Sequence, residues 1–135
     1  MLRNLVLGLI VLFSIAACNK KDSVGPLGGK GGTGKILVTP VYNGSDFGKL
    51  PVYLKWNNLR PEGCLFLLRY DDTAYCNQLS GKPTAIFENL KPGEYWAHVN
   101  GIDSNNNSAN PYYGNKFVVL KEGETLTIDL NIIAY

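Results

Sequence analysis

The sequence predicts an all-β protein, an antiparallel seven-stranded β-sandwich that follows an N-terminal signal peptide and a linker. From residue 35 onward, apolar and β-branched residues alternate with polar residues, as in strands that bury one face. Turn-forming residues separate these runs at intervals of roughly 8–12 residues, which is typical of sandwiches. After the signal peptide, no run shows the period of an amphipathic helix.

The N-terminus has the organisation of a secretory signal peptide. A positive charge at Arg3 precedes the apolar stretch Leu5–Phe13, and the small residues Ala16 and Ala17 stand directly before Cys18. The apolar stretch is shorter than the run of about 20 residues that a membrane-spanning helix needs. A buried N-terminal helix or a membrane span is the alternative interpretation.

Residues 15–18, Ile-Ala-Ala-Cys, resemble the lipobox of bacterial lipoproteins. The resemblance implies that Cys18 becomes the first residue of the mature chain and carries several acyl chains, which together make a stable anchor. The stretch Cys18–Asp22 is similar to lipoprotein N-termini of the Bacteroidota. This similarity implies attachment to the outer membrane, facing either the periplasm or the cell surface.

Composition divides the chain into three parts: residues 1–17 as signal peptide, residues 18–34 as the lipidated cysteine with a glycine-rich linker, and residues 35–135 as the β-sandwich domain. The linker ends in VGPLGGKGGTG, a flexible composition. The chain has a formal net charge of +2, but from Ile36 onward it carries eight basic and ten acidic residues. The basic excess therefore lies in the linker, near lipid headgroups, or simply in solvent. A folded part that is not basic gives no indication of nucleic-acid binding.

The strands of the domain are predicted from alternation and from the turns between them. Pro40 lies within the first run, so that strand is expected at an edge or at a bulge. Asn43-Gly44 and Pro92-Gly93 are turn signals. The predicted strands are 36–42, 50–56, 64–70, 83–88, 94–100, 112–120 and 125–133, with a short return at 74–77.

Two cysteines remain once Cys18 is assigned to lipid. Cys64 and Cys76 form an even pair in an exported chain, where disulfides persist. The short loop that they close predicts a bridge worth about 3 kcal/mol by the chain-entropy model. Two buried free thiols are the alternative.

The segment 85–103, AIFENLKPGEYWAHVNGID, resembles the prealbumin-like or carboxypeptidase regulatory-like β-sandwich modules. The motif residues are Phe87, Asn89, Leu90, Pro92, Gly93 and Tyr95. The resemblance implies a hairpin whose apolar residues lie in the core and a structural, adhesive or carbohydrate-adjacent role. Hydrolytic transthyretin relatives end in Tyr-Arg-Gly-Ser, whereas this chain ends in Asn-Ile-Ile-Ala-Tyr. The enzymatic activity is therefore not carried over.

No set of residues indicates catalysis. His98 is the only histidine, and no nucleophile motif accompanies it, so no enzyme and no cofactor are predicted. The aspartates Asp46, Asp71, Asp72 and Asp103 lie in expected loops and carry suitable oxygen ligands for calcium, but their spacing is not that of an EF-hand. No metal site is predicted from them.

Surface aromatic residues are the candidate ligand contacts: Trp56, Trp96, Tyr112 and Tyr113. Alternation places Trp96 and His98 together on the strand face opposite Tyr95, as the expected exposed pair, with a core position as the alternative. Asp72-Thr73-Ala74 resembles the O-glycosylation pattern of Bacteroidota, which makes Thr73 a candidate acceptor. The sequence thus predicts a lipid-anchored binding, adhesion or envelope-assembly module, or a carbohydrate-binding accessory lipoprotein. The expected partners are the membrane and a glycan or an envelope protein.

Overall fold

The computed structural model describes residues 28–56, 70–104 and 110–135. The predicted signal peptide, Cys18 and Cys64 lie outside this part of the chain. The described residues form an all-β fold, and none of them belongs to a helix that is long and apolar enough to cross a membrane. The strands are β1 (Lys30–Tyr42), β2 (Ser45–Asp46), β3 (Val52–Lys55), β4 (Asp72–Ala74), β5 (Asn77–Leu79), β6 (Lys82–Leu90), β7 (Gly93–Ile102), β8 (Pro111–Leu120) and β9 (Thr125–Ala134).

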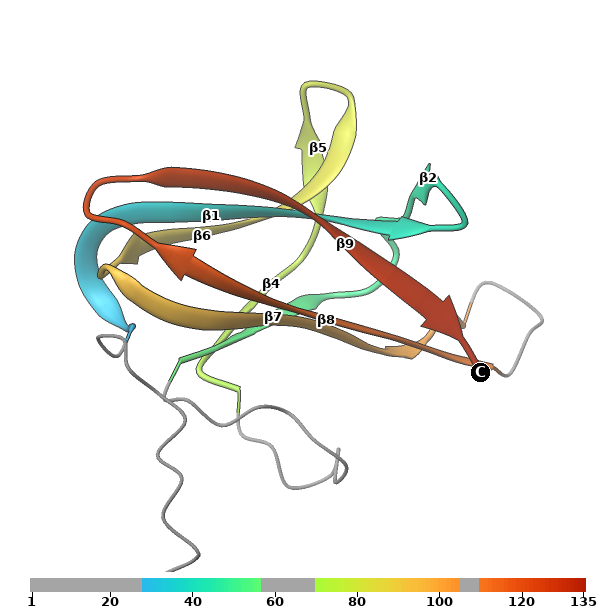
Figure 1. Cartoon of the computed structure of the whole chain (residues 1–135). Coiled ribbons are helices and arrows are strands. Elements are labelled where there is room, and N and C mark those ends of the chain that lie inside the picture. The colour runs from blue at the N-terminus through green and yellow to red at the C-terminus, as the bar shows by residue number, and fades with distance from the viewer. Residues whose placement is uncertain (1–27, 57–69, 105–109) are drawn as a thin grey trace, which may run out of the picture.

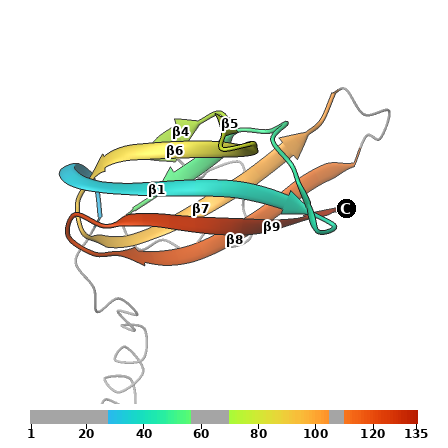
Figure 2. The same ribbon diagram turned by 90° about the horizontal axis from the view of Figure 1, so that it is seen from above.

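The strands form one curled, mixed sheet in the order β4-β3-β7-β8-β9-β1-β6-β5, with β2 paired to β1. The curl brings the half that contains β3, β7 and β8 to face the half that contains β9, β1 and β6 (Figures 1 and 2). Apolar side chains from both halves meet in a single core, as the inward residues of alternating strands must. The largest fully buried side chains include Tyr95, Phe87, Ile36, Leu54 and Leu120.

The strand count and the direction of one pair differ from the sequence prediction. Nine strands are present among the described residues, and β1 runs parallel to β9 over eight residue pairs, from Lys35 with Thr125 to Tyr42 with Ile132. The other strand pairs are antiparallel. Alternation with a period of two is the same in both orientations, so the sequence pattern carries no information about this pair. Residues 64–69 of the predicted third strand lie outside the described residues, and Tyr70 is not part of a strand.

Pro40 lies in a central strand, not at an edge. The pairing of β1 with β6 ends at Val38, and its pairing with β2 begins at Val41, so Pro40 occupies the gap between two partners. The carbonyl of Pro40 accepts a hydrogen bond from the Phe47 amide at 2.8 Å on this side. A missing N–H at this position therefore removes no bond from a sheet ladder.

The first strand begins at Lys30, within the predicted linker. Glycine is needed in this stretch because neighbouring groups come very close to the backbone. A Cβ on Gly32 would lie 2.1 Å from the carbonyl oxygen of Leu90, and one on Gly28 would lie 2.5 Å from the Tyr95 ring. Gly28, Gly32 and Gly34 thus allow close packing at the start of β1, within the segment that the sequence predicts as a flexible linker.

Tyr95 fixes the start of β1 to the turn between β6 and β7. Its hydroxyl donates to the carbonyl of Lys91 at 2.6 Å and accepts from the amide of Gly29 at 2.8 Å. The amide of Lys91 in turn donates to the Gly29 carbonyl at 2.8 Å. The core position expected for Tyr95 is present, since the side chain is fully buried.

Candidate binding surface

The outer face of β3, β7 and β8 carries several aromatic residues. Side chains that alternate with the core residues Leu54, Ala97 and Val99 point to this face. The strand register places them in rows, with Lys55, Trp96 and Phe117 in one row and Tyr53, His98 and Asn115 in the next. We define the outer aromatic face as Tyr53, Tyr70, Trp96, His98, Tyr113 and Phe117.

Ring contacts join the members of the outer aromatic face into two groups. Tyr70 stacks on Tyr53 with a centroid separation of 4.3 Å and on His98 at 5.4 Å. Tyr113 meets His98 edge-on at 5.0 Å. Trp96 lies beside Phe117 with ring centroids 5.2 Å apart. These contacts hold the rings in fixed positions on a paired sheet, which makes a preorganised surface.

His98 is buried on this face and is not the exposed residue that alternation predicted. Only 1% of its surface is exposed, because Tyr70 and Tyr113 cover the ring. Neither ring nitrogen has a hydrogen-bond partner among the described residues. Burial lowers the pKa of His98 to about 4, so the imidazole is neutral at physiological pH. A neutral histidine that is buried beneath two aromatic rings has a packing role, because a substrate cannot reach its nitrogens to exchange a proton.

The exposed part of the outer aromatic face lies along β8. Phe117 is 42% exposed and Val119, two residues further on the same face, is 53% exposed, while Trp96 and Tyr113 are half-buried. Phe117 and Val119 are thus two exposed apolar side chains on the same face of one strand, which makes them candidate contacts for a partner.

Two of the predicted contact aromatics occupy other positions. Tyr112 is 4% exposed and packs against Tyr42 and Phe47 with centroid separations of 5.2 and 4.7 Å, so it is a core residue. Side chains alternate along β8, so the side chain of Tyr112 points inward whereas that of Tyr113 points outward. Trp56 is half-buried against the core and meets Tyr95 edge-on at 6.2 Å. The structure therefore brings Trp96 and Tyr113 to one face and separates them from Trp56 and Tyr112.

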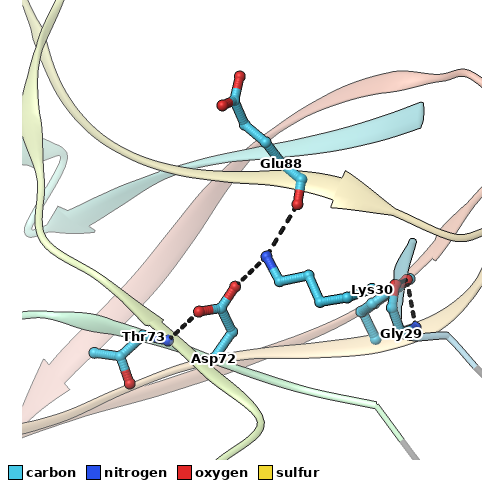
Figure 3. Close-up of polar contacts among 6 residues, drawn as sticks. Gly29, Lys30, Asp72, Thr73 and Glu88 are labelled. Atoms are coloured by element: carbon cyan, nitrogen blue, oxygen red, sulfur yellow. Dashed lines mark hydrogen bonds and ion pairs between the residues drawn. The ribbon is translucent and has the colours of Figure 1, made fainter. Parts of the chain in front are cut away.

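A lysine joins the two halves of the sheet near the edge strand β4. The ammonium of Lys30 contacts Asp72 of β4 at 2.5 Å and donates to the carbonyl of Glu88 in β6 at 2.9 Å (Figure 3). The other carboxylate oxygen of Asp72 accepts from the amide of Thr73 at 2.9 Å. Thr73, the candidate O-glycosylation residue, is exposed on this edge strand.

Three of the four aspartates considered for calcium have other partners. Asp71 accepts from the Trp56 amide at 2.8 Å, Asp72 pairs with Lys30, and Asp103 pairs with Lys49 at 2.9 Å. Within the described residues, no three His, Cys, Asp or Glu side chains gather as metal ligands. Asp46 lies in the short strand β2.

The disulfide expected between Cys64 and Cys76 is not seen. Cys76 is a free, half-buried thiol whose sulfur lies 4.0 Å from the carbonyl oxygen of Leu50, and Cys64 lies outside the described residues. Burial raises the pKa of the Cys76 thiol, which lowers its reactivity at neutral pH.

Comparison with known proteins identified no relative of this chain. The chain matches no protein-family model, no curated protein and no solved structure. The assignment of the outer aromatic face as a candidate binding surface therefore rests on the geometry of this chain alone. Sequence reasoning missed Tyr53, Tyr70 and Phe117 as members of this surface, although the register of β3, β7 and β8 places Tyr53 and Phe117 beside His98 and Trp96.

Proposed function

We propose that this chain is a lipid-anchored protein of the bacterial cell envelope whose β-domain binds a partner and does not catalyse a reaction. The anchor is supported by the signal peptide pattern and by Cys18 after Ile-Ala-Ala. The observation that carries the binding role is the partly exposed row of Trp96, Phe117 and Val119 on a rigid sheet.

The domain is proposed to be a variant of the prealbumin-like or carboxypeptidase regulatory-like sandwich. The burial of Phe87, Leu90 and Tyr95 supports this, as the motif implies. The hairpin that the resemblance implies is not present, because β6 pairs with β1 and β5 whereas β7 pairs with β3 and β8 in the other half of the sheet. The two facing halves of the curled sheet resemble the layers of a sandwich, with the parallel pair of β1 and β9 as an addition. Modules of this kind are usually structural, adhesive or associated with carbohydrate.

Carbohydrate is the second candidate ligand. The apolar faces of sugar rings stack on aromatic side chains while their hydroxyls need polar partners, and the outer aromatic face has both groups. Asn115, which donates to the Tyr113 hydroxyl, lies between Tyr113 and Phe117 on β8, and Asn100 pairs with Tyr113 across the strands. An aromatic surface next to amide groups therefore supports binding of a glycan.

A glycan array probed with the purified full chain tests the surface. Trp96→Ala removes the ring beside Phe117 and is expected to abolish any glycan signal, whereas Tyr75→Ala removes a ring that is 73% exposed outside the outer aromatic face and leaves the signal unchanged. Urea titrations first establish that both variants are folded and have the same midpoint of unfolding as the wild type. Absence of a glycan signal from the wild type would reject the carbohydrate candidate and leave an envelope protein as the partner.

A further inference from the structure

The strand β8 has one free edge over most of its length. It pairs with β7 from Pro111 to Leu120, but with β9 only through Tyr112 and Tyr113. Figure 1 shows β8 and β9 close together near the C-terminus and separating toward the turn that joins them. The backbone of β9 still lies against Gly114, where a Cβ would be 2.5 Å from the carbonyl oxygen of Asn131. Beyond Gly114, as far as Leu120, this edge of β8 has no strand partner among the described residues.

The backbone groups on the free edge can be assigned. The carbonyl of Pro111 accepts from the amide of Tyr135 at 3.1 Å, so the odd residues of β8 direct their backbone groups toward β9. The free edge therefore presents the N–H and C=O groups of Asn115, Phe117 and Val119. Phe117 and Val119 also carry exposed apolar side chains. An incoming strand would find backbone partners and an apolar contact at the same residues.

Lys116 lies between these residues and marks the free edge with a positive charge. It belongs to the inward-facing set of β8 with Tyr112 and Val118, yet it is exposed, because the sheet opens at this point. Its ammonium donates to the backbone carbonyl of Asp129 in β9 at 3.0 Å. A lysine that points inward at an edge strand opposes unselective strand pairing.

We propose that the free edge of β8 is a strand-addition site for an extended segment of a partner protein. The segment pairs with Asn115, Phe117 and Val119 through its backbone, places apolar residues beside Phe117 and Val119, and places an acidic residue opposite Lys116. The acidic residue replaces the carbonyl of Asp129 as the partner of Lys116, which makes the charge of Lys116 a selectivity element.

A second copy of this chain fits the site less well. In a dimer, the edge of a second copy would place one of its own inward-facing residues opposite Lys116. On β8 these residues are Gly114, Lys116, Val118 and Leu120, and on β9 they are Leu126, Ile128 and Leu130. None of them is acidic, so self-pairing leaves Lys116 opposite an apolar side chain or another lysine. Charge complementarity therefore favours a different, acidic partner.

The test uses the full chain in detergent. The probes are capped nine-residue peptides in which threonine and valine alternate and the central threonine is replaced by glutamate or by lysine. Fluorescence anisotropy is expected to show that the glutamate peptide binds about tenfold more tightly than the lysine peptide, and that Lys116→Glu reverses this preference. In amide hydrogen exchange, Asn115, Phe117 and Val119 should become protected when the glutamate peptide is added.

A matched pair of variants isolates the backbone contribution. Val119→Pro removes an N–H that lies on the free edge, so the pairing of β8 with β7 is retained, and binding should fall about tenfold. Val119→Thr keeps the N–H and should bind like the wild type. Equal binding by Val119→Pro, or no saturable binding of the glutamate peptide, would overturn the proposal. The proposal deepens the binding role proposed above and rests on it, but these peptide results are separate from glycan binding and from acylation of Cys18.

Discussion

Protonation of the single buried histidine should destabilise the fold as the pH falls. The pKa of His98 is lowered by burial from 6.5 to about 4, so the neutral form is favoured in the folded state. This contribution to stability is fully present above pH 6.5 and is lost as the pH falls toward 4. Since one pKa unit corresponds to about 1.4 kcal/mol, the loss in the free energy of unfolding amounts to about 3 kcal/mol.

Urea unfolding of the wild type and of His98→Phe at several pH values between 7.5 and 4 measures this loss. Phenylalanine keeps a ring between Tyr70 and Tyr113 and removes the two unpartnered nitrogens. Carboxylates titrate equally in both proteins, so the difference between their free energies of unfolding isolates His98. The variant should gain about 3 kcal/mol relative to the wild type between pH 7 and pH 4.

The same residue gives a direct spectroscopic check. Because the chain has one histidine, a single imidazole resonance reports its titration. A midpoint near 6.5, or parallel pH profiles for the two proteins, would refute the argument that the aromatic cover desolvates His98.

Three further predictions concern stability and thiol chemistry. Tyr95→Phe removes the hydroxyl that joins Gly29 and Lys91, and should lower the free energy of unfolding by about 2–3 kcal/mol in urea titrations, because buried backbone groups lose their partner. Gly32→Ala places a methyl group against the Leu90 carbonyl and should lower it by about 2 kcal/mol or more in the same assay. The bridge predicted from the sequence between Cys64 and Cys76 should protect both thiols from alkylation until a reductant is added to protein isolated from the envelope, whereas Cys76 as the free thiol of the structure would be alkylated without reductant once the chain is unfolded, as measured by mass spectrometry.

The two stability predictions have matched controls. Tyr75→Phe changes an exposed tyrosine and should shift stability by less than about 0.5 kcal/mol, and Gly44→Asn, at a position with φ of +77° and open space, should also be mild. Equal destabilisation by variant and control would contradict the packing argument. Alkylation of both cysteines without reductant in the unfolded chain would show that no bridge forms.

The β class and much of the core were predictable from the sequence because alternation directly reports which side of a strand is buried. Ile128, Leu130 and Ile132 alternate in the last strand and are buried, as expected. Strand direction and curl were not predictable, because they depend on contacts between distant segments. The parallel pairing of β1 with β9 is one such contact.

The candidate surface was predicted only in part for the same physical reason. Alternation placed Trp96 and His98 on one face correctly, but it cannot show that Tyr70, from outside the strand, covers His98. The glycines near residue 32 suggested flexibility by composition, whereas the structure uses them for close contact with Leu90. Composition does not distinguish a glycine that is mobile from one that is tightly packed.

We propose that Cys18 holds this β-domain at a membrane. Intact mass spectrometry of the protein purified from bacterial envelopes measures this most directly. The wild-type chain is expected to begin at Cys18 and to carry the mass of covalently attached acyl chains, whereas Cys18→Ser should give a chain without acyl groups. A wild-type chain that starts at another residue, or that starts at Cys18 without acyl groups, would contradict it.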